Sequence, residues 1–300
     1  MSNHHHAPQN FNHAFAIGIS LNLGFVIVEA WYGWQSGSLA LLADAGHNLS
    51  DVGGLLLAWA AMAASNLKSN ERHSYGWRRG SILASFTNAL LLLVAMGFLS
   101  GEAVERLAQP SGIAGLTVII VATIGVVLNS VTAWLFLKGS KHDLNIRGAF
   151  LHMAADALVS AGVIIAGILY LWKEWSWLDP VVSLIIAGVV IIGTWSLFKR
   201  SLHLLFDGVP DDIDLPAVSA SLIALPGVNA LHDLHIWALS TTETALTAHL
   251  VVDDDCDTGL LLCQAEAMLH KDYELHHVTL QIETHTYADN CHSGQCGITQ

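Results

Sequence analysis

Charged residues are scarce in this chain, and basic residues are the scarcest. Asp, Glu, Lys and Arg make up 12% of the 300 residues, whereas 53% are hydrophobic. The 12 Lys and Arg are outnumbered by 25 Asp and Glu, and the mean hydropathy is +0.50. Soluble globular domains carry about 25% charged residues, so this is not a soluble globular composition. The shortage of Lys and Arg also excludes a basic surface for nucleic acid.

Cysteine is scarce too, and it is confined to one end of the chain. Cys256, Cys263, Cys291 and Cys296 all lie within the last fifty residues, and none lies in a long apolar stretch. Acidic residues also gather after Asp207 and supply most of the formal charge of −13. The last third of the chain therefore differs in character from the rest.

Long apolar stretches dominate the first two thirds. Six of them are long enough to cross about 30 Å of hydrocarbon as helices. They lie at roughly 12–34, 39–64, 80–104, 113–137, 146–172 and 179–199. Nine Lys and Arg residues lie in the connections on one side of these stretches and two on the other, which predicts that both termini are cytoplasmic. We expect a cytosolic tail at 1–11 and six transmembrane helices within 12–206.

Shorter elements follow the last apolar stretch. The patterns predict a helix, two strands, a second helix and a third strand, at 213–225, 228–239, 244–252, 258–271 and 277–286. The order αββαβ predicts a small cytosolic α+β domain of ferredoxin-like or metallochaperone-like type over 207–286, with an antiparallel or mixed sheet. A Cys-containing tail at 287–300 completes the chain.

Two of the apolar helices carry the same pair of ionisable residues. His47 and Asp51 lie in the second helix, and His152 and Asp156 lie in the fifth. Residues four apart share one face of a helix. A carboxylate at the centre of a membrane helix costs about 2.5 kcal/mol or more and usually marks an ion pathway. A neighbour could satisfy one such polar group, but chance does not readily explain the repeated spacing. If the helices face each other, the four side chains form a His₂Asp₂ set suited to Zn²⁺.

A second group of ligand-type residues lies in the expected C-terminal domain. It comprises His232, His235, His249, His276, Glu283, His285, Cys291 and Cys296. Each His taken alone is more often a surface residue than a ligand. Beside an intramembrane site, the set as a whole favours metal binding. Disulfides are rare in the cytosol, so Cys291 and Cys296 are better interpreted as thiolate ligands.

These motifs together resemble the cation diffusion facilitator family. The resemblance rests on LLADAGHNLSD at 41–51, HMAAD at 152–156, RHSYGWRR at 72–79, FDGVP at 206–210 and LHDLHIW at 231–237. It extends over about residues 10–285, and the short, His-poor loop between the fourth and fifth helices resembles the bacterial zinc-efflux branch. The resemblance implies a homodimeric metal/proton antiporter of the bacterial inner membrane.

The resemblance also implies roles for particular residues. The transported ion would be held by His47, Asp51, His152 and Asp156. A cytosolic metal site at a dimer interface would use His232, His249 and Glu283. A second cytosolic site would use His276, Cys291 and Cys296, and His4–His6 of the partner chain could join it. Arg79 would form a salt bridge with Asp207.

One departure from the family pattern concerns the loop between the second and third helices. Some bacterial relatives bind metal there through one Asp and two His. Only His73 is present in this chain, because Asn70 and Trp77 occupy the other two positions. That site is therefore not expected here. The His at position 47 implies, from the family pattern, a preference for zinc over cadmium.

The ligand chemistry agrees with antiport. Imidazole and carboxylate must lose protons to bind Zn²⁺, and His titrates near neutral pH, so a site opening alternately to each side would exchange metal for protons. Other divalent cargo remains open: Cd²⁺, Co²⁺, Ni²⁺, Mn²⁺ or Fe²⁺. One rival is a zinc-dependent intramembrane hydrolase, but the chain has no H-E-x-x-H motif and no candidate general base beside the site, so no enzyme is expected. Another rival is a metal-sensing membrane receptor that uses only the cytosolic domain.

Overall fold

The computed structural model describes residues 10–65, 69–109, 112–137 and 144–284. Within these ranges it describes side chains except those of 10–21, 55, 58–59, 61–65, 135–137, 144–149 and 152. The chain divides into two compact units. The first comprises Met1–Leu56 and Thr87–Leu197, and the second comprises Leu57–Phe86 and Phe198–Gln300.

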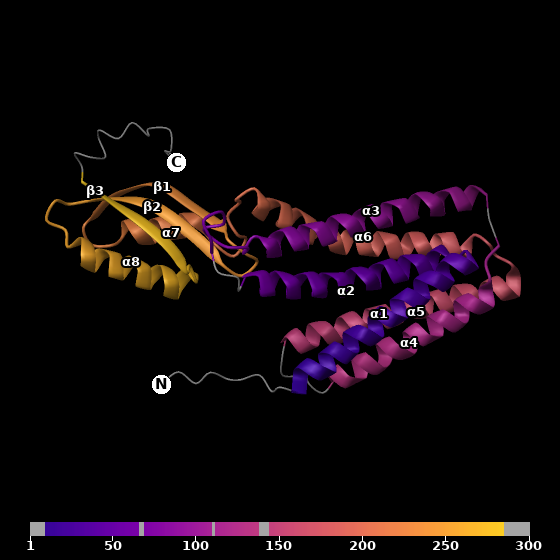
Figure 1. Ribbon diagram of the computed structural model, residues 1–300. Coiled ribbons are helices and arrows are strands. Elements are labelled where there is room, and N and C mark those ends of the chain that lie inside the picture. The colour runs from indigo at the N-terminus through magenta and orange to yellow at the C-terminus, as the bar shows by residue number, and fades with distance from the viewer. Residues whose placement is uncertain (1–9, 66–68, 110–111, 138–143, 285–300) are drawn as a thin grey trace. The chain divides into compact units, whose positions relative to one another are not determined.

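Six long helices follow the six apolar stretches of the sequence (Figure 1). They are α1 (Asn10–Ser36), α2 (Leu39–Ser65), α3 (Gly80–Ala108), α4 (Gly115–Leu137), α5 (Leu144–Lys173) and α6 (Leu178–Leu205). Among the described residues, four helices are long and apolar enough to cross a membrane: α3, α4, α5 from Met153 onward, and α6. This finding does not extend to α1 and α2, because many of their side chains lie outside the described part of the chain. The expectation of six crossings is thus supported for four helices.

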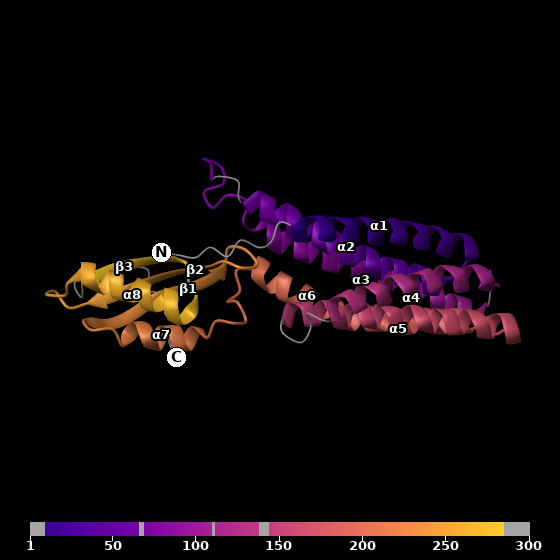
Figure 2. The same ribbon diagram turned by 90° about the horizontal axis from the view of Figure 1, so that it is seen from below.

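Small residues allow the helices of the first unit to approach closely. A Cβ atom on Gly46 would lie 2.9 Å from the side chain of Met96, and one on Gly167 would lie 2.8 Å from Ile119. The glycine in α5 thus lets α4 and α5 lie side by side (Figure 1 and Figure 2). Large apolar side chains such as Phe98 and Ile192 face outward, as expected where lipid is the solvent.

The start of α2 is anchored by the start of α6. The Asp179 carboxylate accepts a hydrogen bond of 2.8 Å from the backbone N–H of Leu39 and another of 2.5 Å from the Ser38 hydroxyl. Backbone N–H groups in the first turn of a helix have no partner within the helix, so Asp179 supplies one from a neighbouring element. This contact holds α2 in place two turns before His47.

The C-terminal part of the second unit has the predicted order αββαβ. It comprises α7 (Leu215–Ile223), β1 (Val228–Ala238), β2 (Thr244–Val252), α8 (Thr258–Tyr273) and β3 (His277–Thr284). The strand order is β1-β2-β3. β1 and β2 pair antiparallel, whereas β2 and β3 pair parallel through α8, so the sheet is mixed.

Both short helices pack on one face of this sheet. Alternate residues of β2, Leu246, Ala248 and Leu250, form a core with Leu222 of α7 and Leu269 of α8. Successive side chains of a strand point to opposite faces. His249 therefore lies on the face that the helices leave uncovered, and the candidate ligands of the three strands gather there.

Candidate metal sites

The first candidate site lies between α2 and α5 in the first unit. Helical periodicity places Asp51 one turn after His47, and their Nε2 and Oδ2 atoms are 3.7 Å apart. Asp156 of α5 brings its Oδ1 to 3.4 Å from the same His47 nitrogen. Asp156 is buried, whereas His47 and Asp51 are half-buried. One imidazole and two carboxylates from two helices thus meet around one point.

The separations in this group suit a bound metal ion. Zinc bonds to nitrogen and oxygen are about 2.0–2.2 Å long, so adjacent ligands of a tetrahedral zinc lie about 3.3 Å apart. The two measured contacts, at 3.4 and 3.7 Å, are close to that value. Hydrogen bonds between the same groups would be about 2.7–2.9 Å long. The two separations from His47 therefore match the spacing of ligands around one zinc ion.

The predicted fourth ligand, His152, lies one turn before Asp156 in α5. Positions four apart share a helix face, so the backbone places His152 on the face that carries Asp156. Its side chain lies outside the described part of the chain. The role of His152 as a ligand stays a prediction.

Four further polar residues are buried beside this group, and sequence reasoning gave none of them a role: Glu29 of α1, Asp44 and Asn48 of α2, and Ser160 of α5. The Ser160 hydroxyl donates to Asp44 Oδ2 at 2.8 Å, and Asn48 donates to Glu29 Oε2 at 3.3 Å. The sequence did hold a signal for Asp44. It lies three residues before His47, and this spacing places another carboxylate on the helix face that carries the ligands.

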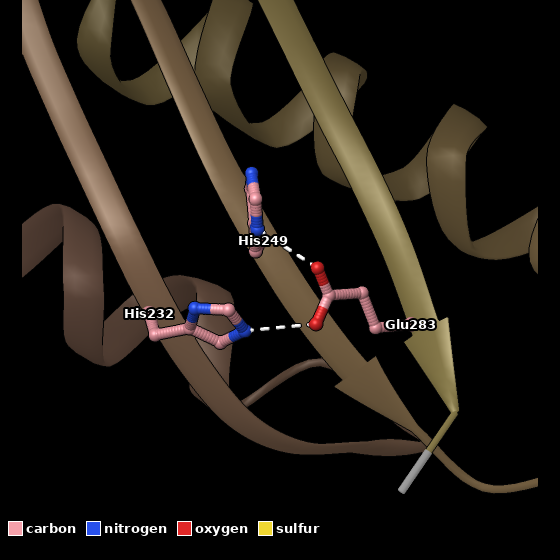
Figure 3. A group of neighbouring side chains, drawn as sticks. All are labelled: His232, His249 and Glu283. Atoms are coloured by element: carbon pink, nitrogen blue, oxygen red, sulfur yellow. Dashed lines mark hydrogen bonds and ion pairs between the residues drawn. The ribbon is translucent and has the colours of Figure 1, made fainter. Parts of the chain in front are cut away.

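The second candidate site lies on the open face of the sheet (Figure 3). His232 of β1 pairs directly with His249 of β2, and their ring centroids are 4.9 Å apart. Glu283 of β3 lies two residues beyond Gln281, the partner of His249, so its side chain has the same orientation. The strand register thus brings one ligand from each of three strands together.

Short contacts join the three side chains of the sheet site. Glu283 is buried, and its Oε2 forms a hydrogen bond of 2.9 Å with His232 Nε2. Its Oε1 lies 2.8 Å from His249 Nδ1 and accepts a hydrogen bond of 2.7 Å from Gln281. Both separations are shorter than those of ligands around a metal, although only the His232 contact is a hydrogen bond and His249 Nδ1 has no hydrogen-bond partner among the described residues. A metal ion would have to displace a proton and move the carboxylate from His232.

Asp233 extends the sheet site beyond the predicted ligands. Its Oδ2 lies 3.5 Å from His249 Nε2, and its Oδ1 forms a hydrogen bond of 2.9 Å with His235. The pairing of β1 with β2 is irregular between His232 and His235, and Asp233 has a positive φ of 53°. This bulge turns the Asp233 side chain toward His249. A carboxylate on the second ring nitrogen would favour the tautomer whose Nδ1 is free to bind metal.

The remaining predicted residues lie in several places. Arg79 forms an ion pair with Asp207 within the second unit, and both side chains are exposed. His276 stacks on His270, with ring centroids 4.6 Å apart. In the α2–α3 loop, the His73 ring packs against the Trp77 ring, with centroids 4.3 Å apart. The remaining candidates lie outside the described residues: His4–His6, His285, Cys291 and Cys296.

Comparison with known proteins gives a family match over most of the chain. The cation efflux transmembrane domain matches residues 15–206, and the cation efflux protein, cytoplasmic domain, matches residues 210–285. Similar proteins include a cadmium, cobalt and zinc/H(+)-K(+) antiporter of Bacillus subtilis (strain 168), 36% identical over 95% of this chain and 93% of its own length. They also include the zinc transporter ZitB of Escherichia coli (strain K12), 34% identical over 98% of this chain and 94% of its own length.

Among solved structures, the metal-bound C-terminal domain of the CzcD transporter from Cupriavidus metallidurans is 39% identical. It covers 24% of this chain and 99% of its own length, with a TM-score of 0.23. The two family matches together span nearly the whole chain, and the two relatives named above are cation transporters by name. The chain belongs to the cation diffusion facilitator family, in its zinc-efflux branch, and is a membrane transporter that exports metal cations.

Proposed function

We propose that this transporter exports Zn²⁺ from the cytoplasm in exchange for protons, and that His47, Asp51, His152 and Asp156 hold the ion in transit. One observation carries the proposal: His47 Nε2 lies 3.4 and 3.7 Å from carboxylate oxygens of two different helices. Those separations are near the ligand spacing of a four-coordinate zinc ion. Nitrogen and oxygen ligands suit Zn²⁺ better than they suit a soft metal ion such as Cu⁺.

Proton exchange follows from the charges of this set. Two carboxylates offset the two positive charges of the metal, and imidazole binds metal only as the neutral base. Protons and Zn²⁺ therefore compete for the same atoms. A helix unit that opens the site first to one side and then to the other would move the two in opposite directions. Inward flow of protons would then drive Zn²⁺ out.

The surrounding architecture is proposed to follow the family. Six helices within 12–206 would cross the inner membrane of a bacterium, with both termini in the cytoplasm, because Lys and Arg gather in the connections on one side. The domain at 207–286 would be cytosolic and would join two copies of the chain. His232, His249 and Glu283 would bind a regulatory Zn²⁺ there, while a second site at His276, Cys291 and Cys296 would depend on the C-terminal tail.

The test is transport by the purified protein in liposomes that contain a zinc-sensitive dye. We expect Zn²⁺ flux that depends on a pH gradient across the membrane and reverses direction when the gradient is reversed. The same assay ranks the possible substrates, because Cd²⁺, Co²⁺, Ni²⁺, Mn²⁺ and Fe²⁺ can each be tested for inhibition of Zn²⁺ flux. The similar Bacillus subtilis protein is named for cadmium, cobalt and zinc, so the first two are the strongest competitors to examine. Flux that ignores the pH gradient would refute antiport.

A further inference from the structure

Two carboxyl groups are fully buried in the first unit and are not part of the proposed transport site. Glu29 of α1 and Asp44 of α2 both have a relative accessibility of 0%. Each has one satisfied oxygen: Asn48 donates to Glu29 Oε2 at 3.3 Å, and Ser160 donates to Asp44 Oδ2 at 2.8 Å. Burial of an unpaired charge is costly, so the state of the remaining oxygens decides whether this pair is stable.

The remaining oxygens are Glu29 Oε1 and Asp44 Oδ1. Both are buried, and neither has a hydrogen-bond donor among the residues that the structure describes. Asn48, which donates to Glu29, lies one turn after Asp44 in α2, so the two carboxyl groups lie beside the same face of that helix. Ionised carboxylates are acceptors only, so two of them repel. One proton between them removes the repulsion and forms an O–H···O⁻ hydrogen bond, as in other buried carboxyl pairs.

The neighbouring groups favour a proton over a metal cation in this position. Asn48 and Ser160 both direct donor hydrogens toward the carboxyl groups. A metal cation would instead need their lone pairs. The pair also lies next to the transport site, because Asp44 precedes His47 by about one turn of α2 and its donor Ser160 follows Asp156 by one turn of α5.

We propose that Glu29 and Asp44 share one proton, and that loading of the transport site releases it. The inference rests on the proposed function, because it makes this pair a proton carrier separate from the metal ligands. The negative charge of Asp156 helps to retain the shared proton. A bound Zn²⁺ offsets that charge, so the pair binds its proton less tightly. The O–H bond then breaks, its electrons stay on the carboxylate oxygen, and the proton passes to water.

The coupling is reciprocal. A proton on the pair weakens Zn²⁺ binding by the same factor as bound Zn²⁺ weakens proton binding. When the site opens to the proton-rich side, protonation of the pair helps to expel the metal. At least one of the exchanged protons is thus carried by residues that do not touch the ion.

Glu29→Gln provides the test, because its amide nitrogen can donate to Asp44 in place of the shared proton. The variant keeps the hydrogen bond and the single negative charge of Asp44, but the amide proton that replaces the shared proton is not released at these pH values. We compare protons released per Zn²⁺ bound by the full-length protein in detergent, using calorimetry in buffers of different ionisation enthalpy. The variant should release about one proton fewer, and the slope of log Kd against pH should fall by about one. Asp44→Asn is the reciprocal variant and should lose the same proton.

Glu105→Gln is the matched control, since Glu105 is an exposed carboxyl on α3 and should leave the proton count unchanged. A count in Glu29→Gln or Asp44→Asn equal to that of the parent would overturn the proposal. Release of K⁺ or Na⁺ instead of a proton on Zn²⁺ binding would overturn it too. Failure of the proposed function is distinguishable, because a parent that binds Zn²⁺ with proton release but does not transport it in liposomes would refute only the transport claim.

Discussion

The two candidate metal sites use similar side chains but differ in how those side chains are spaced. Between α2 and α5, His47 lies 3.4 and 3.7 Å from two carboxylates. On the sheet, Glu283 lies 2.8 and 2.9 Å from two imidazoles. The helix group has the separations of ligands around a metal, whereas the carboxylate and imidazoles of the sheet group lie closer together than ligands around a metal would. The same types of side chain thus have the spacing of metal ligands in one place and shorter separations in the other.

The secondary structure that carries each site explains part of this difference in spacing. Helical ligands are fixed by the one-turn spacing along α2 and by the contact of two helices, so the two carboxylates cannot easily approach each other. Strands about 4.8 Å apart bring opposite side chains close, and one carboxylate can then bridge two rings. Charge adds to the effect, because two carboxylates repel across the helix site while a single Glu283 attracts both imidazoles when they are protonated.

The largest expected effect comes from removing a helix ligand. Asp156→Ala takes away a buried carboxylate and leaves the transport site one ligand short and less negative. Zn²⁺ flux in liposomes should fall at least about a hundredfold, since loss of even a supporting group at a metal site costs 10–100-fold. Asp51→Ala should behave in the same way. Glu105→Gln is the control, and flux near that of the parent in either Ala variant would show that the ion takes another path.

A lower pH on the side from which Zn²⁺ enters the transporter should have the next largest effect on Zn²⁺ flux. His47 and the carboxylates of the helix site must be free of protons to bind Zn²⁺, so binding is lost as the pH falls. Each displaced proton should change the apparent Kd for transport about tenfold per pH unit where the ligands titrate. The slope of log Kd against pH, measured from initial rates at a fixed opposing pH, counts those protons. A slope of zero would contradict direct competition.

The difference between the two sites also explains how far the sequence could predict them. The pairing of His47 with Asp51 follows from helix periodicity, which is a local property. The approach of Asp156 depends on the packing of α5 against α2 and could only be assumed from the repeated motif. On the sheet, Glu283 meets His249 because β3 pairs parallel to β2, and the sequence left an antiparallel or mixed sheet open.

Residues outside the predicted ligand sets were harder to find. Asp233 reaches His249 through a bulge and a positive φ, which no periodic pattern signals. Glu29 and Asp44 are polar residues of two apolar helices, and only the contact of α1 with α2, through the Asn48–Glu29 hydrogen bond, brings them to one place. The ends of the long helices were easier to predict, because each helix extends about as far as its apolar stretch in the sequence. The stretch at 39–64, for example, corresponds to α2 at Leu39–Ser65.

A smaller effect should follow from Asp233→Asn, which tests whether a supporting carboxylate prepares the sheet site for metal. The Asn amide cannot attract the His249 N–H as strongly, so the tautomer with a free Nδ1 is less favoured. Zn²⁺ affinity of the sheet site should fall about tenfold, measured by calorimetry on the full-length protein in an Asp51→Ala background. Asp272→Asn, an exposed carboxylate of α8 in the same domain, is the control. Equal affinities in both variants would assign Asp233 a structural role only.

The smallest effect on transport should come from removing the sheet ligands themselves. His232→Ala with His249→Ala leaves Glu283 without its two imidazole partners but does not touch the helices that hold the ion in transit. Zn²⁺ flux should stay within about threefold of the parent, since the role proposed for metal at this site is to join two copies of the chain and not to conduct the ion. Zinc bound per chain should fall by one at saturation, and Zn²⁺ should no longer tighten the association of two copies.

Two measurements on this double variant separate regulation from transport. Sedimentation with and without Zn²⁺ reports the association of the chains, and flux in liposomes reports the path. The acidic run Asp253–Asp255 makes two such domains repel, and a bound cation would offset that repulsion. Flux abolished in a well-folded double variant would make the sheet site part of the ion path. Unchanged zinc content would mean that the sheet group, unlike the helix group, holds protons and no metal.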